Sequence, residues 1–162
     1  MPIIIALCVL LVVLNTLLHF EVLAILSWRL PGMQIASRLK LVVVVLAAFA
    51  AHAAEISLYA LAAWASIVLL GIGDLSGPGG AGFVSFLYFS AETYTSLGFG
   101  DIVPSGPLRL LAGVETLNGL LLIGWSASYV YISMERFWDV AAGANASPRP
   151  AVHERTRSDA GS

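Results

Sequence analysis

Charged residues are scarce in this chain: they make up 11% of its 162 residues, while 59% are hydrophobic. An ordinary soluble domain carries charge on roughly a quarter of its residues. Such a shortage of charge over so long a chain favours lipid over water as the main solvent. The formal net charge of −2 offers no basic surface, so we expect no nucleic-acid partner.

Cysteine is almost absent, because Cys8 is the only one in the chain. A lone cysteine excludes an internal disulfide and a cysteine metal cluster. Lys and Arg are missing from Met1 to Leu18, although a secretory signal peptide needs positive charge at its start. We therefore interpret the first apolar run as a retained membrane helix.

Three long apolar runs dominate what is present, at residues 3–28, 39–71 and 108–138. Each exceeds the roughly 20 residues that a helix needs to cross the hydrocarbon core of a bilayer. The sequence therefore predicts an all-α integral membrane protein with three transmembrane helices.

A fourth apolar segment, residues 83–96, is too short to span a membrane. A glycine-rich stretch precedes it, and the motif GFG follows it. Non-helical backbone at membrane depth survives only when it is buried in protein or lines a wet cavity. The pattern predicts a re-entrant helix followed by a loop that lies in such a place.

Positive charge gathers on one predicted side of the membrane. Seven of the eight basic residues lie in the first loop or after the last helix: Arg29, Arg38, Lys40, Arg136, Arg149, Arg155 and Arg157. This bias predicts a cytoplasmic carboxyl terminus and an external amino terminus. We divide the chain into a peripheral helix and loop (1–38), a main helical unit (39–140) and a disordered cytoplasmic tail (141–162).

The motif TYTSLGFGD at residues 93–101 places Gly98 and Gly100 on either side of Phe99. Glycine tolerates positive φ, so alternating residues can turn successive carbonyls to the same side. Four such strands around an axis would stack rings of oxygens that replace the water around a cation. One segment per chain cannot close a ring, so the smallest complete unit is a homotetramer.

This motif resembles the potassium-channel signature TxTTVGYGD, and the chain is most similar to small bacterial two-helix potassium channels. The resemblance covers residues 40–138 and is most specific over residues 92–104. It implies an outer helix, a pore helix, a selectivity filter and an inner helix in a plasma membrane. It also implies that K⁺ is the permeant ion, that no cofactor takes part, and that K⁺ binds at Ser96, Leu97, Gly98, Phe99 and Gly100.

Three positions depart from the signature: Ser96 replaces threonine, Leu97 replaces valine and Phe99 replaces tyrosine. These departures leave a weakly selective cation channel as an alternative. A non-conducting accessory or sensor protein is a second alternative. A membrane enzyme fits less well, because only a few histidines and glutamates share one depth.

The resemblance also assigns residues that support the filter. It places Glu92 behind the filter and Asp101 at its outer mouth, where two poorly solvated carboxylates would share one proton. Tyr88 stands where relatives carry a tryptophan that bonds the aspartate. We expect Tyr88, Glu92, Thr95 and Asp101 to brace the filter.

The last apolar run carries candidates for a gate or a cavity. Inner helices of the family bend at a glycine, and Gly119 and Gly124 lie near those places, although close helix packing is an equal alternative. Asn118 is a candidate for lining the cavity. Glu115 fits a bond to the pore helix better than a role in the cavity.

Polar residues also interrupt the first two predicted spans. Asn15 and His19 are four apart, and His52 and Glu55 are three apart, so each pair shares a helix face. Hydrogen bonding that docks the first helix is the favoured interpretation, with a proton sensor or a metal site left open. No arginine repeat indicates a voltage sensor, and the gating stimulus is not indicated.

Overall fold

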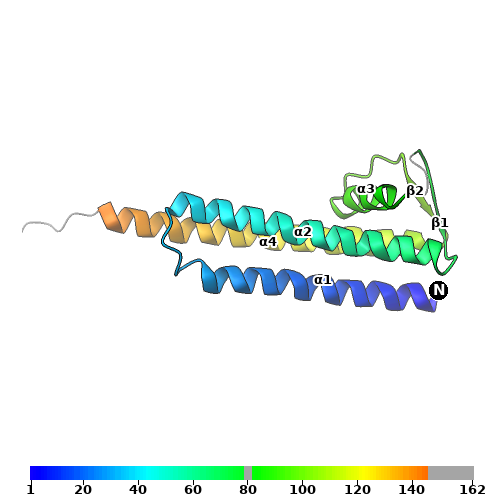
Figure 1. Cartoon of the computed structure of the whole chain (residues 1–162), viewed down its shortest axis with the longest axis horizontal. Helices are drawn as coiled ribbons and strands as arrows, with labels where there is room; N and C mark the ends of the chain where they lie inside the picture. The colour runs from blue at the N-terminus through cyan, green and yellow to red at the C-terminus, as the bar shows by residue number, and fades with distance from the viewer. Residues whose placement is uncertain (79–81, 146–162) are drawn as a thin grey trace, which may run out of the picture.

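The structure, a computed structural model, describes residues 1–78 and 82–145, the last of these (137–145) as backbone alone. It contains three long helices and one short one: α1 (Pro2–Arg29), α2 (Ser37–Val68), α3 (Phe83–Tyr94) and α4 (Leu108–Asn145). The three long helices run side by side, and α3 lies at one end of them (Figure 1). All three are long and apolar enough to cross a membrane, as the sequence predicts.

Proline marks the helix boundaries where the chain turns. Pro2 occupies the first turn of α1, where its missing N–H removes no helical hydrogen bond. Pro31 follows directly after the C-cap of α1 at Leu30 and cannot continue the helix. Pro107 directly precedes α4. The long apolar stretches between these points therefore form single uninterrupted helices.

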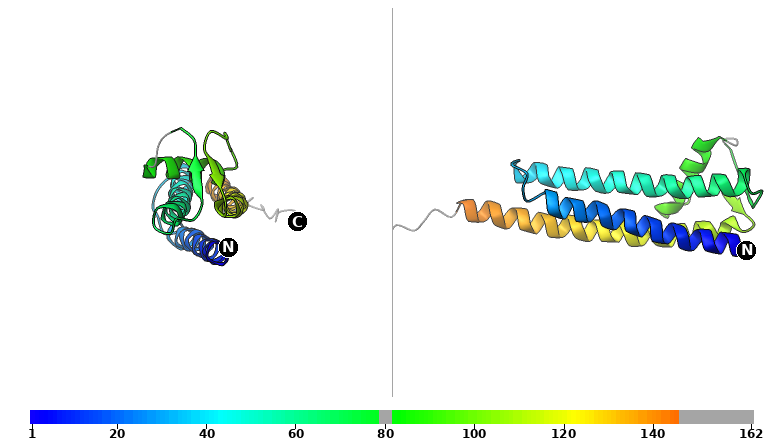
Figure 2. Two further views of the ribbon diagram at one scale, coloured as in Figure 1. Left: turned by 90° about the vertical axis from the view of Figure 1, so that its right-hand side faces the viewer. Right: turned by 60° about the horizontal axis from the view of Figure 1, so that its bottom comes forward.

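The helices α2 and α4 form a central pair with one further helix on each side. The short helix α3 packs on one side of α2 and α4, and α1 packs on the other side (Figure 2). Alanines dominate the buried face of α2, and such small side chains let neighbouring helices approach closely. They are Ala48, Ala51, Ala60, Ala62 and Ala63. The extra helix α1 is therefore docked on the back of the unit that carries α3.

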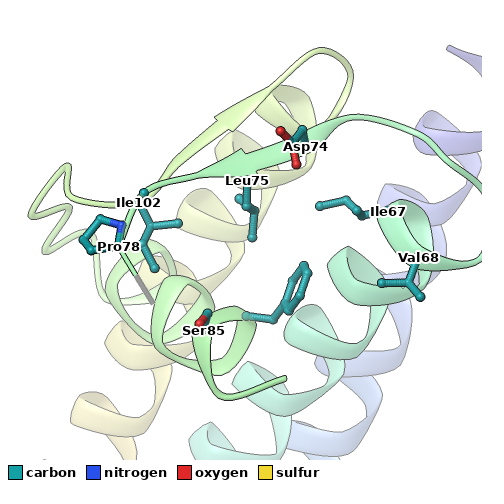
Figure 3. Close-up of a pocket in the computed structure, with 9 residues that line it drawn as sticks. Ile67, Val68, Asp74, Leu75, Pro78, Ser85 and Ile102 are labelled. Carbon is teal, nitrogen blue, oxygen red and sulfur yellow. The ribbon is translucent and has the colours of Figure 1, made fainter. Parts of the chain in front are cut away.

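Two short strands, which the sequence does not predict, join the loops at the α3 end. β1 (Asp74–Ser76) pairs antiparallel with β2 (Val103–Ser105), with Leu75 opposite Pro104. Proline is tolerated here because a two-stranded ladder has only edge strands. Leu75 and Ile102 surround a pocket of about 270 Å³ together with Ile67 near the end of α2 (Figure 3). The ladder thus fastens the loop before α3 to the loop before α4.

The carboxyl-terminal boundary differs from the predicted one. α4 continues to Asn145, so residues 141–145 are helical although the sequence places them in the tail. The rest of the predicted tail, residues 146–162, lies outside the described residues.

Candidate functional site

The predicted filter begins where α3 ends. The N–H of Ser96 donates to the carbonyl of Thr93 at 3.0 Å, and those of Leu97 and Gly98 donate to the carbonyl of Glu92 at 2.8 and 3.2 Å. The N–H of Phe99 donates to Glu92 Oε2 at 3.1 Å. Four successive N–H groups therefore bond back to the last turn of α3, whose carbonyls have no partner within the helix.

The backbone of this segment alternates in the sign of φ. Ser96, Gly98 and Gly100 have φ of +56°, +52° and +78°, whereas Leu97 and Phe99 are not in this region. Because the N–H and C=O of a trans peptide point in opposite directions, the carbonyls of residues 95–98 point away from the groups that accept these N–H bonds. No hydrogen bond among the described residues ends on the carbonyls of residues 96–100. The positive φ at Ser96 is unexpected, because this conformation costs a residue other than glycine about 1–3 kcal/mol.

The segment is uncovered in a single chain. Residues 95–101 are all exposed, and the side chains include Leu97 at 60% and Phe99 at 66% exposure. Backbone carbonyls without a hydrogen-bond partner are unfavourable in lipid. Among the described residues of the chain, nothing covers this stretch.

Tyr88, Glu92 and Asp101 surround the far side of the segment. The hydroxyl of Tyr88 donates to Asp101 Oδ2 at 3.1 Å, the contact that the resemblance implies. Glu92 Oε2 accepts the N–H of Phe99, and the side chain of Glu92 also bonds that of Asp101, as expected. The shared proton between these two carboxyls stays a prediction. Burial raises the pKa of Glu92, and the negative charge of Asp101 adds to this.

Thr95 differs from its expected role in support. Its hydroxyl donates to the carbonyl of Ala91 at 2.7 Å, one turn earlier in α3. Such a bond caps the last turn of the helix locally. Thr95 therefore stabilises the end of α3 and makes no side-chain bond to the filter backbone.

α4 contacts α3 through two polar side chains. Ser90 on α3 donates to Glu115, which is buried as expected for a bond to the pore helix. Thr116, which the sequence analysis missed, donates to the carbonyl of Thr93 at 3.0 Å. Thr116 thus ties α4 to the turn from which the predicted filter starts.

Asn118 does not line an open cavity, contrary to expectation. It is buried, and its Nδ2 donates to Tyr59 Oη on α2 at 3.1 Å. A buried amide needs such a partner, because an unsatisfied one costs about 1–3 kcal/mol. Asn118 therefore joins α4 to α2.

The two candidate hinge glycines have different surroundings. A Cβ built on Gly119 would lie 2.2 Å from the carbonyl oxygen of Tyr94, so only glycine fits at this crossing of α4 and α3. A Cβ on Gly124 would meet nothing within 4 Å. Close packing thus accounts for Gly119, and bending at either glycine stays a prediction.

Three of the four polar residues predicted on the first two helices come together. His19 Nδ1 lies 2.9 Å from Glu55 Oε1, and His52 Nδ1 lies 3.0 Å from Glu55 Oε2. Tyr94 donates to Glu55, and the Nε2 atoms of both histidines lie 3.1 Å from Ser126 Oγ. Neither Tyr94 nor Ser126 carries a sequence signal for this role, because their helices meet the cluster only in the folded chain.

Asn15, the fourth predicted member, stays outside this cluster. It is completely buried on α1, and both atoms of its side-chain amide lack a hydrogen-bond partner among the described residues. Its amide nevertheless lies close enough to the hydroxyl of Tyr59 on α2 to influence that group, so its role in docking α1 stays a prediction.

Comparison with known proteins gives one match, to a family model. No curated protein and no solved structure matches the chain. A family model described as an ion channel matches residues 39–136, which run from the first turn of α2 into α4 and leave out α1. The match covers more than half of the chain, so the protein belongs to this ion channel family, with a two-helix pore unit and α1 as an additional helix.

Proposed function

We propose that this chain forms a potassium-selective channel in which four copies of residues 96–100 meet at one axis. The observation that carries the proposal is the direction of the filter peptides. Their N–H groups, from Ser96 to Phe99, all bond back to α3, and their carbonyls are left free on the other side. Rings of such carbonyls replace the hydration shell of a permeating K⁺ ion.

The position of α3 supports cation binding at the inner end of the filter. α3 ends at Tyr94, directly before the filter segment, so its negative helix end faces the start of that segment. A helix end of this kind carries roughly half an elementary charge. Four such ends around one axis favour a cation there.

A homotetramer explains what the single chain leaves uncovered. Each chain supplies one filter segment, and closed cyclic symmetry is the usual way in which identical subunits complete a ring. The exposed side chains of Leu97 and Phe99 would then be covered by neighbouring copies. The partners proposed are further copies of the chain, the lipid bilayer and K⁺, and the mechanism needs no cofactor.

The three candidate spans make this a multi-pass membrane protein. We place it in the plasma membrane, with the amino terminus outside. Arg29 ends α1, and Arg38 and Lys40 begin α2, so these positive charges lie at the opposite end of the helices from α3 (Figure 1). Positive charge marks the cytoplasmic side, so the α3 end faces outward.

The test is ion flux from purified protein in liposomes. We expect K⁺ flux that barium blocks, and reversal potentials in mixed K⁺ and Na⁺ that follow K⁺. Gly98→Ala should abolish the flux, because alanine strains the positive φ at this position. Gly32→Ala, in the loop between α1 and α2, is the matched control and should leave flux unchanged.

Two results would contradict the proposal. Reversal potentials that do not separate K⁺ from Na⁺ would favour the weakly selective channel. Absence of K⁺ flux from protein that is folded and tetrameric would favour a non-conducting accessory role.

A further inference from the structure

A buried polar cluster joins α1 to the pore unit and takes no part in the filter. We define the α1 cluster as His19, His52, Glu55, Tyr94 and Ser126. His19 and Glu55 are completely buried, and only 18% of the His52 side chain is exposed. The two Nδ1 atoms face the Glu55 carboxylate, at 2.9 and 3.0 Å, and the two Nε2 atoms face Ser126 Oγ, at 3.1 Å each.

Counting protons shows that this ring lacks a donor when both histidines are neutral. The ring has four contacts, two at Glu55 and two at Ser126. A neutral imidazole supplies one proton, a serine supplies one, and an ionised glutamate supplies none. If both imidazoles donate to Glu55, Ser126 has one proton for two nitrogen acceptors. One contact would then bring two acceptors together.

The carboxylate of Glu55 also lacks a partner of opposite charge when both histidines are neutral. With neutral histidines the α1 cluster carries the single negative charge of Glu55 between membrane-spanning helices. An isolated charge is costly there, and such residues normally have a partner of opposite charge. A bound divalent cation would occupy both Nδ1 lone pairs, which leaves each imidazole proton for Ser126, and it would give Glu55 a partner of opposite charge. Release of the Tyr94 proton to solvent on binding would balance the second charge of the ion.

We propose that the α1 cluster binds a divalent transition-metal cation of the zinc type. The ligands are Nδ1 of His19, Nδ1 of His52 and a carboxylate oxygen of Glu55, and the Tyr94 hydroxyl, 3.0 Å from His52 Nδ1, is the fourth donor. Imidazole nitrogen and carboxylate oxygen are ordinary zinc ligands.

Metal binding through both Nδ1 atoms completes the hydrogen bonds of the ring. Each imidazole then carries its proton on Nε2, and both Nε2–H groups donate to the two lone pairs of Ser126 Oγ. Outer partners of this kind fix the orientation of metal-binding histidines. Ser126 is therefore the residue that holds both ligands in position.

The spacing needs little adjustment. The candidate ligand atoms of His19, His52 and Glu55 lie within 4.8 Å of one another. Bonds of about 2.0–2.1 Å in a tetrahedral site put ligand atoms roughly 3.3 Å apart. The histidine–carboxylate contacts of 2.9 and 3.0 Å are slightly shorter, so small outward movements of the side chains admit the ion.

The α1 cluster also borders a cavity on one side. His52, Tyr94 and Ser126 line an open, largely apolar cavity of about 460 Å³ between α2, the end of α3 and α4. His52 is the partly exposed ligand and lies at the edge of this cavity. A bound ion would join α1 and α2 to Tyr94, the last residue of α3 before the filter.

The test uses the full-length chain in detergent, stripped with a chelator and then titrated with Co²⁺ as a spectroscopic probe and with Zn²⁺. We expect one metal ion per chain and the visible absorption of tetrahedral Co²⁺. His19→Ala and His52→Ala should each weaken binding at least 100-fold. His153→Ala removes the third histidine of the chain, which lies far from these two in sequence, and should bind like the wild type.

A second variant separates metal binding from a folding defect. Ser126→Ala keeps every ligand and should weaken binding about 10- to 100-fold. Zn²⁺ should also raise the melting temperature of the wild type and leave that of His19→Gln unchanged. Equal metal content in His19→Ala and the wild type would overturn the proposal. A cluster stabilised by acid but indifferent to metal would overturn it as well, because a proton would then supply the missing donor.

Discussion

The N–H of Phe99 donates to the carboxylate of Glu92 at 3.1 Å, which ties the proposed filter to a side chain buried behind it. The main-chain carbonyl of Glu92 also accepts the N–H groups of Leu97 and Gly98. One residue thus fixes three successive peptides. The bond to Phe99 and the interaction with Asp101 depend on the side chain, so substitution of Glu92 tests these two and leaves the carbonyl contacts in place.

Glu92→Ala should change the gating of the filter, because the N–H of Phe99 loses its partner. An N–H that the proposed tetramer encloses and leaves unsatisfied costs about 1–3 kcal/mol, enough to shift an equilibrium by about 5- to 150-fold. We expect a change of this size in steady-state open probability in bilayer recordings. Glu92→Gln keeps an acceptor oxygen and should stay within about twofold of the wild type. If Ala and Gln behave alike, the bond to Phe99 does not control the filter.

Much of this architecture could be predicted from the sequence because its signals are local. The length of the apolar runs predicts the spans, and the paired glycines at 98 and 100 predict alternating carbonyls. Pairing of Asp74–Ser76 with Val103–Ser105 could not be predicted, because each strand has three residues and only the folded loops bring them together.

Contacts between side chains that are distant in sequence could not be predicted either. Asn118 has the composition of a cavity residue, but its partner Tyr59 lies 59 positions earlier, on α2. Ser96 shows no preference for positive φ, and the hydrogen bonds that hold it come from the end of α3. Tyr94 and Ser126 join the two histidines only because α3 and α4 cross α2 at that depth.

Gly119→Ala should destabilise the subunit, because the new methyl group would lie 2.2 Å from the carbonyl oxygen of Tyr94. Overpacking of this kind typically costs about 1–3 kcal/mol. Thermal unfolding in detergent should show the loss as a lower melting temperature. Gly124→Ala is the matched control on the same helix and should be neutral or slightly stabilising, since nothing lies within 4 Å. A similar loss in both variants would mean that bending at glycine, not contact with α3, explains the requirement.

Asn15→Leu should stabilise the protein, because both atoms of the Asn15 amide are buried without a hydrogen bond. Replacing a buried polar group that has no partner recovers about 1–3 kcal/mol of desolvation free energy. Asn118→Leu provides the contrast. It removes the donor to Tyr59 and should lower stability by about 1 kcal/mol. Opposite shifts in melting temperature are expected, and a loss of stability in Asn15→Leu would show that its amide has a partner in the assembled protein.

Removing K⁺ should weaken the proposed tetramer, because the free carbonyls of residues 96–100 would then repel one another around the axis. An ion bound only by the assembled filter stabilises it by an amount that grows with the logarithm of ion concentration. The melting temperature of the tetramer should therefore rise steadily with K⁺ and much less with Na⁺ at equal ionic strength. Gly98→Ala, which strains the filter backbone, should lose most of this difference, whereas Gly32→Ala should keep it. An equal response of the wild type to both ions would mean that the carbonyls of this segment do not form the K⁺ site.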